Sequence, residues 1–373
     1  DENEPPRCPQ DAHIGGRQLL ARPQRRELRS APDAAALTAA VALAALGLWA
    51  PPASAQTSLG PLRTSEQNPL YRLLGAPEAE PADVVGKGAL RLDASTAYSN
   101  VFEASDGPGY GHLFDLEQMV NSVSARYGVG ESMEVGATLG MFTGWGGFLD
   151  PFISGFHDLF GLPNGGREQR PEGEYRLFLA RAGEGVPAPV ELDVGRNVWL
   201  EDLQLFAKWQ FLGIRESPAA LSVNGVLRGA AGPLDAGRLG GSAAILGRWS
   251  PGPLHLHASA GVAALSAPDE VTAVTRGITH FYTVTAERNL WRGIALLGQL
   301  GGSSAYVRDV SGGDLRGIPL NLVFGFAGLT EGGWGWQLSF AEDILASGPS
   351  VDFTVDVEVS RTFSVPGVPP GGP

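Results

Sequence analysis

The stretch SVDFTVDVEVSRTF, residues 350–363, decides the fold class because its side chains alternate between apolar and polar. The apolar face consists of Val351, Phe353, Val355, Val357, Val359 and Phe363, and Arg361 is the one break in the alternation. A period of two is typical of a β-strand whose two faces meet different surroundings. Residues 350–363 are therefore expected to form a strand with one apolar and one polar face.

Similar segments recur along most of the chain. They lie at residues 87–103, 112–127, 131–144, 173–181, 200–211, 217–229, 239–249, 253–262, 278–289, 291–304, 316–327 and 334–340. Most are well above the ~5–6 residues of an average strand. A secreted soluble β-sandwich would use shorter strands, and a β-solenoid would show a fixed repeat. The pattern predicts an all-β fold, a transmembrane antiparallel up-and-down β-barrel over residues 86–363.

Aromatic residues near the ends of these segments agree with a membrane location. They are Trp199, Trp209, Trp249, Trp291, Trp334 and Trp336. Such residues form girdles where a barrel meets the two membrane interfaces. Phe363 ends the last segment and resembles the C-terminal aromatic signal of outer-membrane proteins, so the outer-membrane assembly machinery is an expected partner. Residues 364–373 are rich in Pro and Gly and are expected to form a flexible tail.

The number of strands is ambiguous from the sequence. The alternating segments number thirteen, whereas single-chain bacterial barrels have an even number of strands. Residues 189–194 could supply a fourteenth strand, or one early segment could lie outside the barrel. We expect twelve strands, with fourteen as the alternative.

Residues 1–55 have the pattern of a removed leader with a secretory signal peptide. Arginines at positions 22, 25, 26 and 29 precede an apolar run, and Ala53-Ser54-Ala55 forms a small-residue cleavage site. The one cysteine, Cys8, lies within this leader. The net charge of -13 argues against nucleic acid as a partner. The expected location is the outer membrane of a Gram-negative bacterium, with membrane lipid as a partner.

One segment reads as a helix. Asp150 is a suitable N-cap, Pro151 suits the first helical position, and Gly161 with Pro163 ends the helix, which predicts residues 151–160. Phe152, Phe156 and Phe160 line one face, which Ile153 and Leu159 widen, and Phe148 has the same spacing just before the helix. A helix this short is marginal alone, so we expect it to dock on the barrel wall, plug the barrel mouth or lie at the membrane interface.

Histidines are the candidate sites for chemistry. His157 and Asp158 are neighbours on the helix and point about 100° apart, so we interpret them as a polar helix edge. His255 and His257 share one strand face and are weak candidates for a metal site, although two lumen-facing polar side chains are the favoured interpretation. An outer-membrane hydrolase would need His112, His157 or His280 beside a Ser–acid pair. The sequence brings together no such group, and it predicts no catalytic residue and no cofactor.

The polar faces of the strands predict the lining of the lumen. These residues are Arg91, Asp93, Arg126, Glu134, Arg176, Asp202, Lys208, Asn224, Arg228, Arg248, Gln299, Asn321, Gln337 and Glu358. Both charge signs occur, which suits either a water-filled pore or a closed, ion-paired interior.

The segment before the barrel, residues 56–85, is Pro-rich and contains a small apolar group around Leu70 and Tyr71. It could fold into the lumen as a plug or form a periplasmic lead-in. The leading functional hypothesis is a narrow, gated or partly plugged channel for small solutes. The alternatives are a non-conducting structural or assembly barrel and an outer-membrane hydrolase.

Two motifs resemble a known family. NPLYRLLGAP at residues 68–77 and GFLDPFISGFHDLFGLPNGGR at residues 147–167 are similar to the bacterial family catalogued as domain of unknown function 3187. The resemblance extends to residue 363, and the second motif is its most specific part. It implies an integral envelope barrel and no particular catalytic residue.

Overall fold

The computed structural model describes residues 58–74, 77–106, 110–160, 166–181, 190–191, 198–214, 217–232, 237–265, 275–291, 293–307, 317–343, 351 and 353–364. The predicted leader, residues 1–55, and all of the predicted tail except Ser364 lie outside these residues. Within the described ranges, the helices are too short or too polar to cross a membrane.

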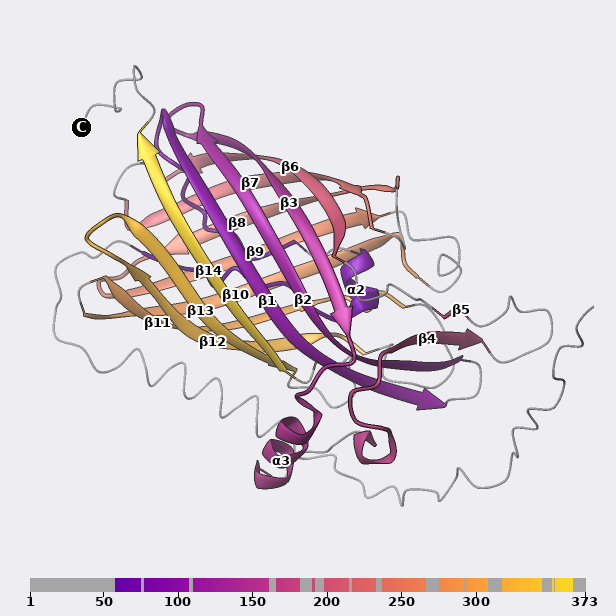
Figure 1. Cartoon of the computed structure of the whole chain (residues 1–373). Coiled ribbons are helices and arrows are strands. Elements are labelled where there is room, and N and C mark those ends of the chain that lie inside the picture. The colour runs from indigo at the N-terminus through magenta and orange to yellow at the C-terminus, as the bar shows by residue number, and fades with distance from the viewer. Residues whose placement is uncertain are drawn as a thin grey trace, which may run out of the picture.

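Twelve antiparallel strands close into one ring (Figure 1). They are β1 (Ala89–Asp106), β2 (Tyr110–Gly128), β3 (Met133–Trp145), β6 (Trp199–Leu212), β7 (Ala219–Ala230), β8 (Leu239–Trp249), β9 (Leu254–Leu265), β10 (Ile278–Trp291), β11 (Ile294–Ser303), β12 (Leu320–Leu329), β13 (Trp334–Asp343) and β14 (Phe353–Ser364). Ring neighbours follow chain order, and β1 pairs with β14 to close the barrel. The predicted fold class is therefore confirmed.

Two further strands lie outside the ring and resolve the ambiguity in strand number. β4 (Arg176–Arg181) pairs with residues 110–115 of β2, beyond the part of β2 that pairs with β3. β5 (Val190–Glu191) pairs only with β4 among the described strands. The segment predicted at 173–181 and the described residues 190–191 of the possible fourteenth strand thus form strands but add none to the barrel wall, because β2 extends past its ring neighbour and offers a free edge there.

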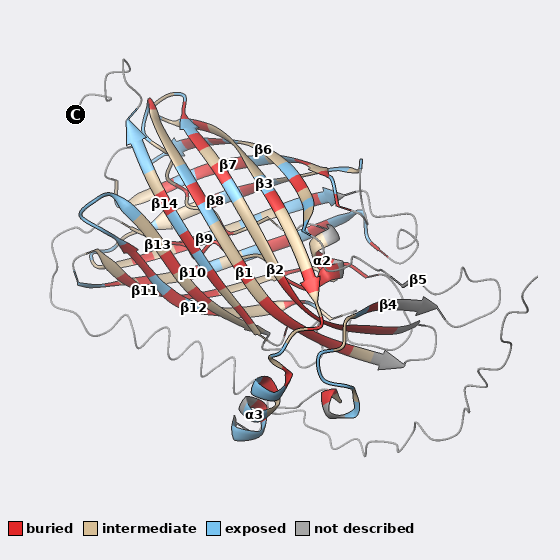
Figure 2. Cartoon of the chain, viewed as in Figure 1, coloured by how far each residue is buried: buried red, intermediate tan, exposed pale blue. Residues whose placement is uncertain are grey.

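The burial pattern is inverted relative to a soluble protein (Figure 2). On β14, Val357 and Val359 are more than 40% exposed on the outer face, whereas Glu358 is 2% exposed on the inner face. A register slip of one residue would turn every such side chain to the opposite face, so the alternation fixes the pairing. An apolar outer wall around a polar interior is the arrangement of a barrel surrounded by lipid.

Exposed aromatic residues mark the end of the barrel that has the short connections. Trp209, Trp249, Trp291 and Trp334 are each at least 45% exposed and lie near the ends of β6, β8, β10 and the start of β13. Phe363 on β14 pairs with Leu90 at the start of β1 and is 40% exposed at the same end. The predicted girdle is thus present at this end, called here the short-turn end.

Three helical segments complete the described structure. They are α2 (Pro69–Leu74), α3 (Asp150–Phe160) and the 3-10 helix η1 (Arg167–Gln169). Figure 1 shows α3 outside the ring, near the part of β1 and β2 that extends past β3, at the end opposite the C-terminus. The helix predicted at 151–160 is confirmed, with Asp150 included.

Candidate functional site

The lumen contains the chain that precedes β1. Residues 58–74 and 77–86, called here the luminal segment, hydrogen-bond to inward-facing side chains around the ring. At the start of the segment, Glu287 of β10 accepts hydrogen bonds from the hydroxyl of Ser58 at 2.7 Å and from the backbone N–H groups of Leu59 and Gly60 at 2.8 and 3.0 Å. Glu287 lies near the short-turn end of β10, so the segment enters the barrel from that end.

Arg63 is the first charged anchor inside the lumen. Its guanidinium lies 3.0 Å from Glu78 of the same segment and 3.4 Å from Glu358 of β14. It also lies 3.7 Å from Asp93 of β1. The side chain is 8% exposed, and a guanidinium that is so buried needs this density of carboxylates. Arg63 therefore ties the segment to the β1–β14 wall.

Glu80 is the matching acidic anchor. It forms a bidentate pair with Arg126 of β2, at 2.6 and 2.7 Å, and lies 3.3 Å from the Lys208 ammonium of β6. Lys208 is itself 2.9 Å from Glu134 of β3. Burial would raise the pKa of Glu80, but Arg126, Lys208 and Arg63 outweigh it and hold that pKa well below its usual range. Glu80 is therefore a carboxylate at neutral pH.

The luminal segment turns at α2, near the end of the barrel with the longer connections. The Tyr71 ring packs edge-on against the Tyr306 ring, with centroids 4.5 Å apart, and both side chains are fully buried. Asn68 donates to Glu103 of β1 at 3.0 Å, and Arg72 pairs with Glu201 of β6. α2 is thus held from several directions at this end.

The segment then returns to the short-turn end. The backbone N–H of Val84 donates to Gln210 at 3.2 Å, and that of Val85 donates to Glu134 at 2.6 Å. Asp83 accepts two hydrogen bonds from Arg248, at 2.6 and 3.0 Å. The chain therefore passes through the lumen twice before it enters β1.

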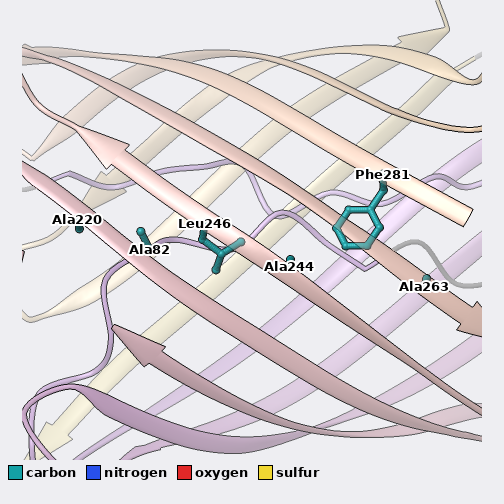
Figure 3. Packing of buried hydrophobic residues seen from close by; sticks show 6 residues of the cluster. All are labelled: Ala82, Ala220, Ala244, Leu246, Ala263 and Phe281. Atoms are coloured by element: carbon teal, nitrogen blue, oxygen red, sulfur yellow. The ribbon is translucent and has the colours of Figure 1, made fainter. Parts of the chain in front are cut away.

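Apolar contacts hold the segment against the opposite wall. Ala82 belongs to a buried apolar cluster with Ala220, Ala244, Leu246, Ala263 and Phe281 of the wall (Figure 3). Leu62 packs with residues of β11 and β12, including Leu297 and Val323. The small side chains of the alanines on the inner face leave room for the luminal segment around Ala82.

Cavities remain beside the segment. A cavity of about 350 Å³ at the short-turn end is lined by Ser58, Asp83, Arg91 and Lys208, among others. A smaller one of about 90 Å³ lies further in and is lined by Glu66, Arg228 and Asp356, among others. Arg63 lines both cavities. The Arg63 side chain therefore lies at the boundary between the two cavities.

The structure places nearly all of the predicted lumen residues on the inner face. Arg91 and Glu358 pair with each other at 3.2 Å, Arg228 pairs with Asp202 at 2.5 Å, and Arg126 lies 3.3 Å from Asp93. Glu134, Lys208 and Arg248 contact the luminal segment or its partners as described above. Arg176 differs: it lies on β4, outside the ring, and its side chain is 49% exposed. The expectation that it lines the lumen is wrong, because β4 follows only the protruding end of β2.

His112, His255 and His257 are hydrogen-bonded to neighbouring side chains of the wall. His255 contacts Ser250 and Asn289, at 2.7 and 2.9 Å, and His257 contacts Glu287 at 3.0 Å. Among the described residues, no three His, Cys, Asp or Glu side chains are arranged to hold a metal ion. His112 pairs with Glu103 at 3.1 Å, and His280 lies exposed near the start of β10.

Ser58, His257 and Glu287 form a Ser–His–acid group that the sequence reasoning missed. The same atom, His257 Nε2, faces both Ser58 Oγ at 3.3 Å and Glu287 Oε2 at 3.0 Å. Ser58 also donates directly to Glu287. A catalytic relay needs the two imidazole nitrogens to face different partners, so this group fits an anchor for the segment rather than a nucleophile.

The predicted helix docks on the outside of the barrel. Residues 147–160 and 166–173, called here the outer block, cover the outer faces of β1 and β2. Glu117 of β2 accepts from the backbone N–H groups of Phe148 and Leu149, at 2.7 and 2.5 Å. Gly147 has φ +79°, and an added Cβ would lie 2.0 Å from Glu117, so this position requires glycine.

An ion pair secures the outer block. Asp150 pairs with Arg167, and Arg167 also donates to Asn100 of β1 at 2.8 Å. The Arg167 guanidinium lies over the Phe102 ring, 4.8 Å from its centroid. The motif at residues 147–167 is thus attached to the wall near its start, through Phe148 and Leu149, and at its end, through Arg167.

Only part of the predicted apolar face of α3 packs against the barrel wall. Ile153 and His157 are buried, whereas Phe148, Phe152 and Leu159 are 71, 59 and 77% exposed. The side chains of Phe156 and Phe160 lie outside what the structure describes. Docking of Phe148 and Phe152 on the barrel wall or in its mouth is therefore ruled out, whereas the membrane interface, the third expected location, stays a prediction. The expectation that His157 lies at a polar helix edge is wrong, because its side chain is buried. The wall beneath is polar, so it takes up Asp150 and His157 instead.

The decisive contacts of the luminal segment were also missed by the sequence reasoning. Leu62 and Ala82 carry no motif, but Leu297 follows Leu296 in β11 and breaks the alternation there. Apolar residues on a polar inner face, here Leu297 and likewise Leu246 and Phe281, are a signal that something apolar lies inside.

Family and structural comparisons agree with this architecture. The family model described as "Protein of unknown function (DUF3187)" matches residues 38–363. The chain belongs to this family. No curated protein matches the DUF3187 chain in a sequence search.

Solved structures resemble the DUF3187 chain in fold. An outer-membrane channel from Pseudomonas putida F1 is 13% identical, with a TM-score of 0.50 over 77% of this chain and 100% of that one. The KdgM porin is 7% identical, with a TM-score of 0.38 over 73% of this chain and 99% of that one. The NanC porin is 6% identical, with a TM-score of 0.39 over 73% and 98%. The scores to the two porins are too low to support an inference, and the Pseudomonas channel supports the fold alone.

Proposed function

We propose that the protein is an outer-membrane channel of a Gram-negative bacterium for small polar solutes, and that the luminal segment narrows it and gates it. The observation that carries this proposal is the path of residues 58–86. They pass twice through a polar barrel and are held largely by ion pairs and hydrogen bonds. Polar contacts can exchange with water at little net cost, so this arrangement favours a movable plug over a permanent core. The last strand, with Phe363, suits insertion by the outer-membrane assembly machinery.

Arg63 is the proposed constriction. It lines both cavities and is surrounded by carboxylates from the segment and the wall. Moving its side chain would join the two spaces, and both charge signs along the route suit small zwitterionic or neutral polar solutes. Twelve strands enclose a narrower lumen than the 16–18 strands of general porins, which suits small solutes.

The test is solute entry into liposomes that contain the refolded protein. We expect slow swelling with small sugars and amino acids for the parent chain, faster swelling for Arg63→Ala, and the fastest for a variant in which residues 58–84 are replaced by a flexible linker. Each variant is first checked for folding by heat-modifiable gel migration. If folded variants are all impermeable, the barrel is a non-conducting structural element and the proposal fails.

A further inference from the structure

The outer wall of β1 and β2 carries polar side chains where a lipid-facing wall should be apolar. Asn100, Asp115 and Glu117 are each at most 4% exposed. Asn100 pairs in register with Glu117, and Ser99 beside it faces inward to Thr354, so Asn100 and Glu117 face outward. The outer block covers them.

The height of these residues along the strand places them at the membrane boundary. Leu90 pairs with Phe363 of the girdle at the short-turn end. Asn100 follows ten residues later, which is about 33 Å along the strand and about 25 Å of height at a tilt of about 40°. An outer-membrane barrel has an apolar band about 25 Å tall. The outer block therefore sits where the far edge of that band ends.

The exposed face of α3 is continuous with the outer wall. The Phe148 ring lies 6.3 Å from the Tyr98 ring, and the Tyr98 ring lies 5.6 Å from the Trp145 ring. Tyr98 belongs to the outward face of β1 and Trp145 ends β3. Phe152 and Leu159 extend this apolar surface along the helix, on a different side from the buried Ile153 and His157.

We propose that α3 is an interfacial helix that inserts Phe148, Phe152 and Leu159 into the outer leaflet, at the boundary between headgroups and acyl chains. An amphipathic helix lying in the membrane plane buries its apolar face at this depth. Asp150, Arg167 and Glu117 fix the helix at one height on the barrel. The helix therefore sets how deeply the outer rim of the barrel lies in the membrane. This inference rests on the proposed membrane location.

The experiment places one fluorescent reporter at a time. Cys8 is the sole cysteine of the chain, so Cys8→Ser gives a background for single substitutions. Phe152→Cys and Leu159→Cys are labelled with an environment-sensitive dye in full-length protein folded into phosphatidylcholine vesicles. Leu205→Cys, on the exposed face of β6, serves as the mid-membrane reference, and Glu331→Cys, in the exposed β12–β13 turn, as the aqueous one.

Lipids that carry a spin label at the headgroup or deep in the acyl chain then quench the dye. We expect blue-shifted emission at positions 152 and 159, with stronger quenching by the shallow label than by the deep one. Position 205 should respond most to the deep label, and position 331 should respond mainly to aqueous iodide.

Three results would overturn an assignment, and they can be told apart. Labels at 152 and 159 that behave like the one at 331 would show that α3 faces water. Labels shielded from both lipid and iodide would show that another protein surface, such as a second copy, covers it. A label at 205 that no lipid quenches would mean that the barrel does not span the bilayer, and the proposed function would then fail as well.

Discussion

Two segments of this chain dock on the same strand, one inside the barrel and one outside. The luminal segment uses the inward residues of β1, such as Asp93 and Glu103. The outer block uses the outward residues Asn100 and Phe102, which alternate with them. Alternation along one strand thus provides two separate docking surfaces. The inner one carries a plug that we propose to be movable, and the outer one carries a fixed helix.

The two attachments differ in how their charges are shared. Inside, Glu80 has three cationic neighbours, so the loss of one leaves the others in place. Outside, Arg167 is the described cation that pairs with Asp150 and bridges to β1. The outer attachment should therefore be sensitive to a single substitution, and the inner one should weaken gradually.

The largest expected effect is at the outer attachment. Arg167→Leu leaves Asp150 buried without its described cation, and removing one partner of a buried pair typically costs about 3–5 kcal/mol. We expect residues 147–173 to become sensitive to protease while the barrel stays folded. Limited proteolysis with mass spectrometry measures this, with Arg170→Leu as the matched control. Equal protection of the two variants would contradict the assigned role of Arg167.

The next effect tests which face meets lipid. Val357→Arg places a cation on the outer wall of β14, and the cost near the bilayer midplane is about 2–4 kcal/mol. We expect a lower yield of folded barrel in vesicles, measured by heat-modifiable gel migration, with Val357→Ala nearly unchanged. Normal yield for Val357→Arg would show that this face does not contact lipid.

A smaller effect is expected inside. Lys208→Met removes one neighbour of Glu80 and Glu134 but leaves Arg126, so the loss should be about 1–3 kcal/mol. The luminal segment should leave the lumen more often, which electrical recordings report as more time in a larger conductance level. Lys87→Met, in the exposed turn before β1, is the control. If Lys208→Met and Lys87→Met spend equal time in the larger conductance level, the ion pairs of Lys208 do not contribute to gating.

Mild acid should have the smallest effect. The pKa of Glu80 is lowered, so its contribution to docking is present above the ordinary value of 4.5 and is lost only as the pH falls through the lowered pKa. Burial raises the pKa of Glu66, and hydrogen bonds from Asn68 and Asn321 offset this rise only in part. The ionised Glu66 side chain therefore destabilises the docked segment, and its protonation at lower pH removes that destabilisation. Lowering the pH from about 7 to about 5 should therefore leave conductance unchanged or reduce it. Acid-induced opening would contradict the charge assignments.

Sequence patterns predicted the barrel because alternation is a local property of each strand. They also predicted α3, because its cap, Pro151 and the glycine after it are local signals. The docked face of α3 depends on Asn100 and Glu117, which lie in other strands, so the apolar stripe alone could not show which side of α3 contacts the wall. The path of the luminal segment depends on carboxylates and cations spread around the ring, and nothing in residues 58–86 themselves reveals that arrangement.

The most direct test of the account compares the two segments in one recording. Single-channel conductance is measured in planar bilayers for the parent chain, a variant lacking residues 58–84 and a variant lacking residues 151–160, all with verified folding. We predict small or rare steps for the parent, much larger steps without the luminal segment, and parent-like steps without the outer helix. Large steps from the variant without 151–160, or none from the variant without 58–84, would show that the luminal segment is not the gate.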